Sequence, residues 1–135
     1  MRPTAFEYRA AAAGLTEPLV RKVVLLFYEK VRHDPLLGPV FAAAIGGSWE
    51  SHIERIIQFW LTATRLGRGY DGRNFMPAHL RNSSIRSALL PRWLEIFRET
   101  TAEHCSSQEA SVLMDIAERM AETLQIGFDR RDLKP

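Results

Sequence analysis

The sequence predicts an all-α protein with a single domain. Apolar residues recur at helical steps of three and four residues in several long segments, and hydroxyl residues and prolines mark where such segments begin. No segment alternates polar and apolar residues as a half-buried strand would. The 135 residues are enough to bury one hydrophobic core. We place the domain at residues 15–128, after a tail or short helix at 1–14 and before a C-terminal tail at 129–135.

The first long helix is predicted within LTEPLVRKVVLLFYEKVRHDP. Thr16 is placed to cap its N-terminus, Pro18 suits its first turn, and Pro35 ends it. One face carries apolar residues at helical spacing: Leu19, Val20, Val23, Val24, Phe27 and Val31. The next segment, LLGPVF, contains Gly38 and Pro39, which predicts a tight connector.

The second long helix is predicted within GGSWESHIERIIQFWLTATRLG. Ser48 is its expected cap, and Gly67 is expected to close it. The segment that follows, GRGYDGRN, is rich in loop-forming residues. It leads into FMPAHLRN, where Pro77 suits the opening of a short helical turn and His79 follows two residues later. We therefore expect His79 on a short apolar turn rather than on a long packed helix.

Two further helices complete the predicted fold. The third covers residues 89–104. Ser106, with Glu109 three residues later, resembles a capping box and opens the fourth helix. We expect the fourth helix to end near Gly127, because a glycine often follows the last helical turn.

Composition and charge narrow the classes of protein. Hydrophobic residues make up 46% and charged residues 25%, which is ordinary for a globular protein. The net charge is only +2 and the arginines are scattered, which argues against a nucleic-acid partner. No apolar run reaches the roughly 20 residues that span a bilayer, so we predict no membrane partner. Cys105 is the only cysteine, which excludes an internal disulfide and predicts a cytoplasmic, reducing location.

The sequence lacks the local motifs of several enzyme classes. It contains no phosphate-binding glycine loop, no dinucleotide fingerprint and no nucleophile elbow. The four histidines, at positions 33, 52, 79 and 104, have neither zinc-finger nor metalloprotease spacing. A zinc site built from His52, His79 and a carboxylate stays open as an alternative that no local motif supports.

Several residues are nevertheless hard to explain by packing alone. Four residues of the second helix share one face, at i, i+3, i+4 and i+7: His52, Arg55, Ile56 and Phe59. Taken alone, this pattern also fits an amphipathic helix with a boundary histidine. Tyr28 likewise fits a boundary tyrosine whose hydroxyl reaches water, and Trp93 fits a core anchor.

A haem group would account for these residues together. A neutral imidazole is a strong axial ligand for haem iron, and His79 on its short turn could supply it. Three side chains could donate an O–H or N–H on the opposite side: Tyr28, His52 and Trp93. The residues that could enclose the macrocycle are Phe41, Ile56, Phe59 and, on the side of His79, Phe75 and Met76. Arg55 could meet a propionate at its edge. Spacing and composition permit this interpretation without requiring it.

Four ordered blocks give the chain a family resemblance: FYEKVRHDPLLGPVF, SWESHIERIIQFW, MPAHL and RWLEIF. In this order and separation they resemble the truncated haemoglobins of the third group, over roughly residues 16–127. The resemblance implies a two-over-two helical sandwich around haem b. It implies that His79 is the proximal ligand and that the distal side is formed by Tyr28, His52 and Trp93. The other positions that match haem-contacting residues of the family are Phe41, Arg55, Ile56 and Phe59.

The resemblance also implies binding of dioxygen and other small diatomic ligands such as nitric oxide. Three donors would hold dioxygen tightly and release it slowly, which suits redox chemistry better than oxygen transport. Nitric oxide detoxification and a peroxidase-like reaction are the two enzymatic interpretations, and both need an external reductant. For nitric oxide oxidation this would be a separate reductase. Two alternatives stay open: an electron-transfer haem protein with His52 as a second axial ligand, and a cofactor-free helical interaction module.

Overall fold

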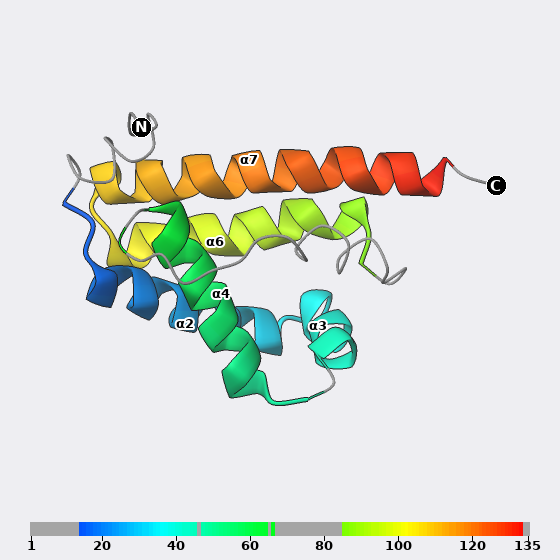
Figure 1. Ribbon diagram of the computed structural model, residues 1–135, viewed down its shortest axis with the longest axis horizontal. Helices are drawn as coiled ribbons and strands as arrows, with labels where there is room; N and C mark the ends of the chain where they lie inside the picture. Colours follow the sequence, from blue (N-terminus) through cyan, green and yellow to red (C-terminus); the bar gives the residue numbers. More distant parts are fainter. Residues whose placement is uncertain (1–13, 46, 65, 67–84, 134–135) are drawn as a thin grey trace.

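The computed structural model describes residues 14–45, 47–64, 66 and 85–133. Within these residues the chain forms five α-helices and one 3-10 turn and no strand, which confirms the all-α prediction (Figure 1). In chain order the elements are α2 (Glu17–His33), α3 (Leu37–Ile45), α4 (Trp49–Ala63), η2 (Ser87–Leu89), α6 (Leu90–His104) and α7 (Ser107–Asp132). No helix among the described residues is long and apolar enough to cross a membrane.

The helices form two packed pairs. The first pair is α6 and α7, which run antiparallel beside each other (Figure 1). The second is α2 and α4, which cross, and α2 also packs against α6 (Figure 1). The short helix α3 packs against α2, and η2 packs against both α6 and α7. This is the two-over-two arrangement that the sequence predicted.

Three predicted helix starts are confirmed by their cap hydrogen bonds. The hydroxyls of Thr16 and Ser48 each accept a hydrogen bond from the N–H three residues later, at 3.4 and 3.2 Å. At the start of α7, Ser106 and Glu109 form both hydrogen bonds of the capping box, at 3.1 and 2.7 Å. Each such cap stabilises its helix by about 1 kcal/mol.

The segment that we predicted to be a connector is instead the helix α3, so that prediction was wrong. The Asp34 carboxylate, directly after α2, accepts hydrogen bonds from two N–H groups at 3.0 and 2.9 Å and thereby caps the new helix. Pro39 lies in the first turn, where no helical N–H is required. Gly38 lets α3 approach α2 closely, because a Cβ at this position would lie 2.6 Å from the Arg32 carbonyl oxygen.

The end of α4 also differs from the prediction. The helix ends at Ala63 rather than at Gly67, and Gly67 lies outside the described residues. Thr64 follows directly, and its buried hydroxyl donates a hydrogen bond to the Trp60 carbonyl oxygen at 2.8 Å. A threonine hydroxyl bonded in this way satisfies one of the last carbonyl groups of the helix.

The last helix is longer than predicted. It continues past Gly127 to Asp132, so the expected end near Gly127 was wrong. Phe128 is fully buried, and the Arg131 guanidinium lies over its ring at 4.8 Å from the centroid. Arg131 also donates a hydrogen bond to the Ile85 carbonyl oxygen at 3.0 Å. These contacts hold the last turns of α7 in the helix, and a single glycine inside the helix costs only about 1 kcal/mol.

An aromatic cluster holds α2, α4 and α6 together. Phe27 of α2 contacts Trp93 and Phe97 of α6, with ring centroids 5.4 and 4.9 Å apart. Trp60 of α4 stacks on Phe97 at 5.0 Å. Such aromatic pairs contribute roughly 0.5–1.5 kcal/mol each beyond the area they bury. The cluster fixes the three helices around Tyr28, the neighbour of Phe27 in the sequence.

Candidate functional site

Tyr28 and Trp93 form the buried centre of the candidate site. Tyr28 lies on α2 and Trp93 near the start of α6, and the two residues are only 6% and 9% exposed. The Trp93 indole N–H, which can only donate, hydrogen-bonds to the Tyr28 phenol. Burial raises the pKa of Tyr28 to about 12, and the hydrogen bond from Trp93 limits that rise. Tyr28 is therefore a neutral phenol at physiological pH.

The direction of this hydrogen bond decides what Tyr28 can do. Its phenolic oxygen accepts from Trp93, so the hydroxyl keeps its own proton for donation to another group. The sequence had treated Tyr28 and Trp93 as two separate donors. In the structure they form a pair, in which the Trp93 N–H donates to the Tyr28 oxygen.

Phe41 lies next to this pair, and one face of α4 carries the other predicted side chains. The Phe41 ring, on α3, is 5.9 Å from the Tyr28 ring. The predicted shared face of α4 contains three half-buried residues: His52, Ile56 and Phe59. The adjacent face of α4 is fully buried in the core through Ile53, Ile57 and Trp60. The helix therefore has one completed packing face and a second face on which apolar side chains stay half-buried.

The remaining predicted site residues are Arg55, His79 and Met76. Arg55 is exposed on α4. His79 and Met76 lie outside the described residues, together with Phe75, and so their roles stay predictions. In the part of the chain that the structure describes, no group of three or more His, Cys, Asp or Glu side chains could hold a metal ion.

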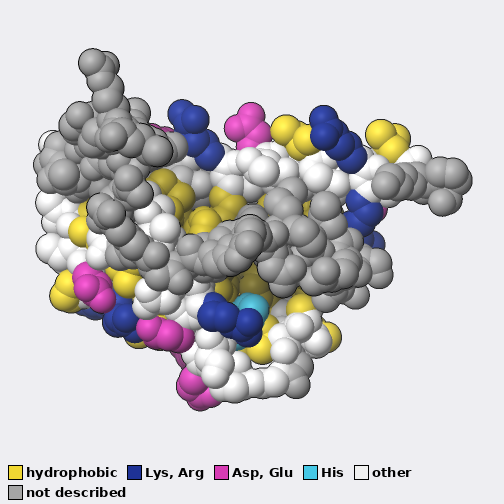
Figure 2. Space-filling view, in the orientation of Figure 1, with side chains coloured by type: hydrophobic (Ala, Val, Ile, Leu, Met, Phe, Trp, Pro, Cys, Tyr) yellow, Lys and Arg dark blue, Asp and Glu magenta, His cyan; other side chains and the backbone are white. Residues whose placement is uncertain are grey.

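The surface in Figure 2 has hydrophobic side chains near its centre, beside the grey segments. One histidine side chain is visible there, next to a basic side chain and to hydrophobic ones (Figure 2). Most acidic and basic side chains lie nearer the outer edge of this face (Figure 2). Apolar surface with a few polar groups is the usual composition of a small-molecule site.

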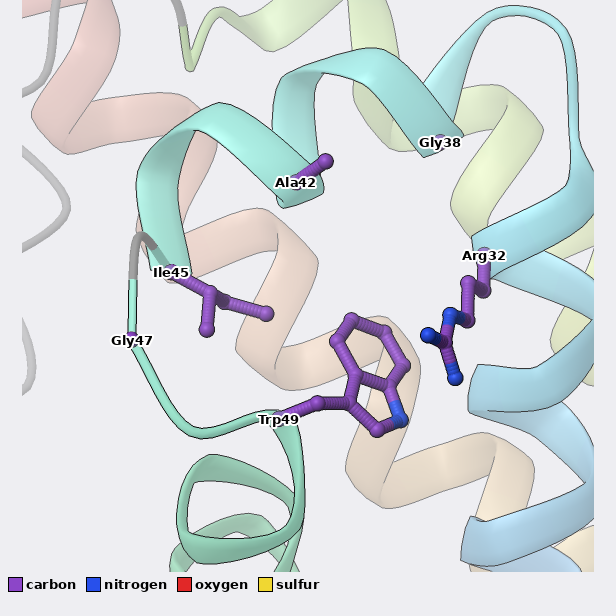
Figure 3. A pocket seen from close by; sticks show the side chains of 6 residues that line it. All are labelled: Arg32, Gly38, Ala42, Ile45, Gly47 and Trp49. Atoms are coloured by element: carbon purple, nitrogen blue, oxygen red, sulfur yellow. The ribbon is translucent and has the colours of Figure 1, made fainter.

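A pocket of about 350 Å³ lies between the end of α2, α3 and the start of α4 (Figure 3). It is lined by Arg32, Gly38, Ala42, Ile45, Gly47 and Trp49. The Arg32 guanidinium lies over the Trp49 ring, 5.0 Å from its centroid. None of the candidate residues named above lines this pocket, so it is separate from the candidate site.

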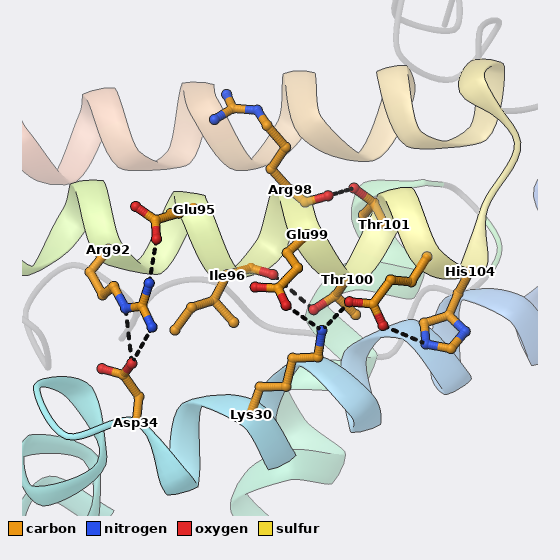
Figure 4. A network of polar contacts seen from close by, with 11 residues as sticks. Lys30, Asp34, Arg92, Glu95, Ile96, Arg98, Glu99, Thr100, Thr101 and His104 are labelled. Carbon is orange, nitrogen blue, oxygen red and sulfur yellow. Dashed lines mark hydrogen bonds and ion pairs between the residues drawn. The ribbon is translucent and has the colours of Figure 1, made fainter.

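An ion pair that the sequence did not reveal joins the buried Asp34 carboxylate to Arg92, the residue before Trp93. The Asp34 side chain is 3% exposed, and its Oδ1 accepts from Arg92 Nε at 2.9 Å and Nη2 at 2.7 Å (Figure 4). Burial alone would raise the pKa of Asp34, but hydrogen bonds from Arg92 and from the N–H groups of Leu37 and Leu36 outweigh it and lower that pKa. Asp34 precedes Pro35, a local signal of a helix end, whereas no local signal identifies a partner 58 residues away.

Comparison with known proteins decides the family. No family model matches the chain. A group 3 truncated haemoglobin of Campylobacter jejuni is 31% identical over 115 residues, which cover 82% of this chain and 89% of that protein. The chain belongs to the group III truncated haemoglobins. The resemblance predicted from the four sequence blocks is thereby confirmed.

A solved structure gives the same answer for the fold of this truncated haemoglobin. The crystal structure of the group III truncated haemoglobin from Campylobacter jejuni superposes with a TM-score of 0.78 at 28% identity. The match covers 84% of this chain and 91% of that chain. Membership of a truncated haemoglobin family implies a haem cofactor and small diatomic ligands.

Proposed function

We propose that this truncated haemoglobin binds haem b with His79 as the proximal iron ligand and with Tyr28, Trp93 and His52 on the distal side. The observation that carries the proposal is the buried, hydrogen-bonded pair of Tyr28 and Trp93. Phe41 lies next to Tyr28, and Ile56 and Phe59 of α4 are two more apolar side chains that the core leaves half-buried.

The described side chains fit the chemistry of one side of a haem. The group is a flat apolar macrocycle with two charged propionates at its edge. Phe41, Ile56 and Phe59 offer half-buried aromatic and branched apolar surface, and Tyr28 offers one neutral donor beside it. Arg55 is exposed on α4, where its guanidinium can reach solvent and an anionic edge. We assign Arg55 to a propionate and Met76 to the side of His79.

When bound, the haem supplies an iron centre that binds diatomic ligands and exchanges single electrons. Tyr28 donates its hydroxyl proton in a hydrogen bond to the ligand, while Trp93 holds the phenolic oxygen. A hydrogen bond to a charged acceptor contributes roughly 1.5–3 kcal/mol, which slows ligand release about ten- to a hundredfold. His52, half-buried on α4, is a second donor or a residue of the ligand entrance.

Slow release favours a reaction of bound ligand over oxygen transport. We propose nitric oxide detoxification, in which nitric oxide, dioxygen and one electron give nitrate. A separate reductase supplies that electron in this proposal. The single cysteine, Cys105, supports a cytoplasmic location for this chemistry.

The cofactor assignment is tested by the visible absorption spectrum of the purified ferrous protein, with and without carbon monoxide. His79→Ala should lose most of its haem or show an altered carbon-monoxide spectrum. His33→Ala and His104→Ala are the matched controls, because these residues contact Glu29 and Glu103 at the surface. Normal haem content and an unchanged spectrum in His79→Ala would reject the proximal assignment.

The reaction is tested by mixing ferrous protein equilibrated with dioxygen with nitric oxide, and ferric protein with peroxide and an electron donor. Rapid nitrate formation that continues with a reductase, and that slows in Tyr28→Phe, supports detoxification. If Tyr28→Phe leaves the nitric oxide reaction unchanged but abolishes peroxide turnover, nitric oxide detoxification is rejected and the peroxidase-like reaction is supported. Sharp six-coordinate bands in the ligand-free ferrous protein would indicate electron transfer with His52 as a ligand. A colourless protein that takes up no haem would indicate an interaction module.

A further inference from the structure

Asp34 and Arg92 link the two helices that carry the Tyr28–Trp93 pair. Asp34 directly follows α2, which carries Tyr28, and Arg92 directly precedes Trp93 on α6. The Asp34 carboxylate uses one oxygen for Arg92 and the other for the N–H groups at the start of α3, at 3.0 and 2.9 Å. One buried carboxylate thus joins α2, α3 and α6, and Figure 4 shows its contact with Arg92.

Aromatic packing holds the Trp93 ring in the core but supplies no hydrogen bond to align its N–H. The Trp93 and Phe97 rings are nearly parallel, 4° apart with centroids at 5.9 Å. A hydrogen bond from the indole to the phenol needs a donor–acceptor distance near 2.9 Å and good alignment. A guanidinium held to a carboxylate through two nitrogens has both the charge and the fixed geometry to set that position.

A second ion pair joins the same two helices and provides a comparison. Lys30 of α2 contacts Glu103 at 2.6 Å and Glu99 at 3.4 Å on α6 (Figure 4). Both acids are about half exposed, at 46% and 58%, whereas the Asp34 side chain is 3% exposed. The two basic side chains are similarly exposed, Lys30 at 31% and Arg92 at 38%, so the two interactions differ in the burial of the acid and in the two-nitrogen contact of Arg92.

We propose that the Asp34–Arg92 ion pair is a positioning pair that holds the Trp93 indole N–H against the Tyr28 oxygen. Through this hydrogen bond the pair sets how well Tyr28 donates to a ligand, a consequence that rests on the proposed function. Neither Asp34 nor Arg92 has to touch the ligand for this role.

The test compares Arg92→Gln, which removes the ion pair with Asp34, with Lys30→Gln, which removes the ion pairs with Glu99 and Glu103. The first readout is the Trp93 indole N–H signal in proton–nitrogen NMR spectra of the carbon-monoxide-bound ferrous protein, assigned by its loss in Trp93→Phe. Arg92→Gln should shift this signal and speed its hydrogen exchange about fivefold, the loss of one neutral hydrogen bond. Lys30→Gln should change neither, even where it lowers the melting temperature as much.

Further variants distinguish an effect on the position of Trp93 from an effect of the Arg92 charge and from a loss of folding. Arg92→Lys keeps the positive charge but cannot hold the carboxylate through two rigid nitrogens. It should therefore be as stable as the parent but show the shifted indole signal of Arg92→Gln. Asp34→Asn also weakens the cap of α3, and if it does not fold, Arg92→Gln leaves that cap intact and carries the test. Glu95→Gln removes the other acidic contact of Arg92 and should leave the indole signal as in the parent.

The second readout is dioxygen release, which Arg92→Gln should speed about tenfold and Lys30→Gln by less than about twofold. An indole signal that responds equally to Arg92→Gln and Lys30→Gln would overturn the positioning role. A shifted signal with unchanged release, in protein with normal haem content, would overturn its consequence for the ligand. In protein that takes up no haem the proposed function fails, and the indole signal of the haem-free chain still decides whether the pair positions Trp93.

Discussion

Replacing Gly38 with alanine should destabilise the fold and displace Phe41 from Tyr28. A Cβ at position 38 would lie 2.6 Å from the Arg32 carbonyl oxygen, 3.3 Å from the Arg32 carbonyl carbon and 3.4 Å from the Val31 oxygen. These are backbone atoms of α2, which cannot turn away as a flexible side chain would. Overpacking of this kind costs roughly 1–3 kcal/mol. Alanine regains about 0.5–1 kcal/mol because it forms helices more readily than glycine.

The net loss is therefore about 0–2.5 kcal/mol of unfolding free energy with a central value of about 1 kcal/mol, or a fall of roughly 5 °C in melting temperature for a chain of this size. Thermal unfolding followed by circular dichroism measures it. Gly47→Ala is the matched control, because a Cβ there would meet only the Ile45 oxygen at an ordinary 3.8 Å. Equal melting temperatures for Gly38→Ala, Gly47→Ala and the parent would show that α3 does not depend on close approach to α2.

Two further predictions concern the titration of Tyr28 and the cap of α7. The tyrosinate absorbance of Tyr28, identified by its loss in Tyr28→Phe, should appear only as the pH rises toward about 12. In Trp93→Phe it should appear at still higher pH, because the hydrogen bond that lowers the pKa of Tyr28 is lost. The pKa of Tyr28 in the folded protein lies above its ordinary value of 10.0, so the contribution of Tyr28 to stability is complete below pH 10 and falls as the pH rises toward 12. A tyrosinate titration midpoint near pH 10 in the folded parent would contradict the burial of Tyr28. Ser106→Ala should lose about 1 kcal/mol with the capping box, and Ser107→Ala, one residue inside the helix, should stay close to the parent in thermal unfolding.

The parts of the fold that depend on neighbours in sequence were predictable. Thr16, Ser48 and Ser106 cap helices through bonds to N–H groups three residues away, so their patterns are visible in the sequence. The segment LLGPVF was wrongly predicted as a connector because Gly38 and Pro39 are typical of turns, whereas the Asp34 carboxylate at the end of α2 also opens the next helix. A side chain that serves two helices gives the same local signal as one that serves a single helix.

The parts of the site that depend on distant residues were only partly predictable. Tyr28 and Trp93 were identified singly, but their pairing follows from the packing of α2 on α6 and has no sequence signature. Arg92 was not identified at all, because its role depends on a carboxylate 58 residues earlier. The prediction for His79 rests on the family and on its proline-supported turn, since this residue lies outside the described part of the chain.

The short connection between α6 and α7 has a consequence for the order of folding. Only Cys105 and Ser106 separate the two helices, and the capping box fixes the turn between them. Closing so short a loop costs little chain entropy, so we expect this hairpin to assemble early. The contacts of α2 with α6 join residues as far apart as Lys30 and Glu103, 73 positions along the chain, and such contacts form late. Tyr28 therefore meets Trp93 in one of the last steps, and a folding intermediate that already contains the α6–α7 hairpin still lacks the distal donor pair.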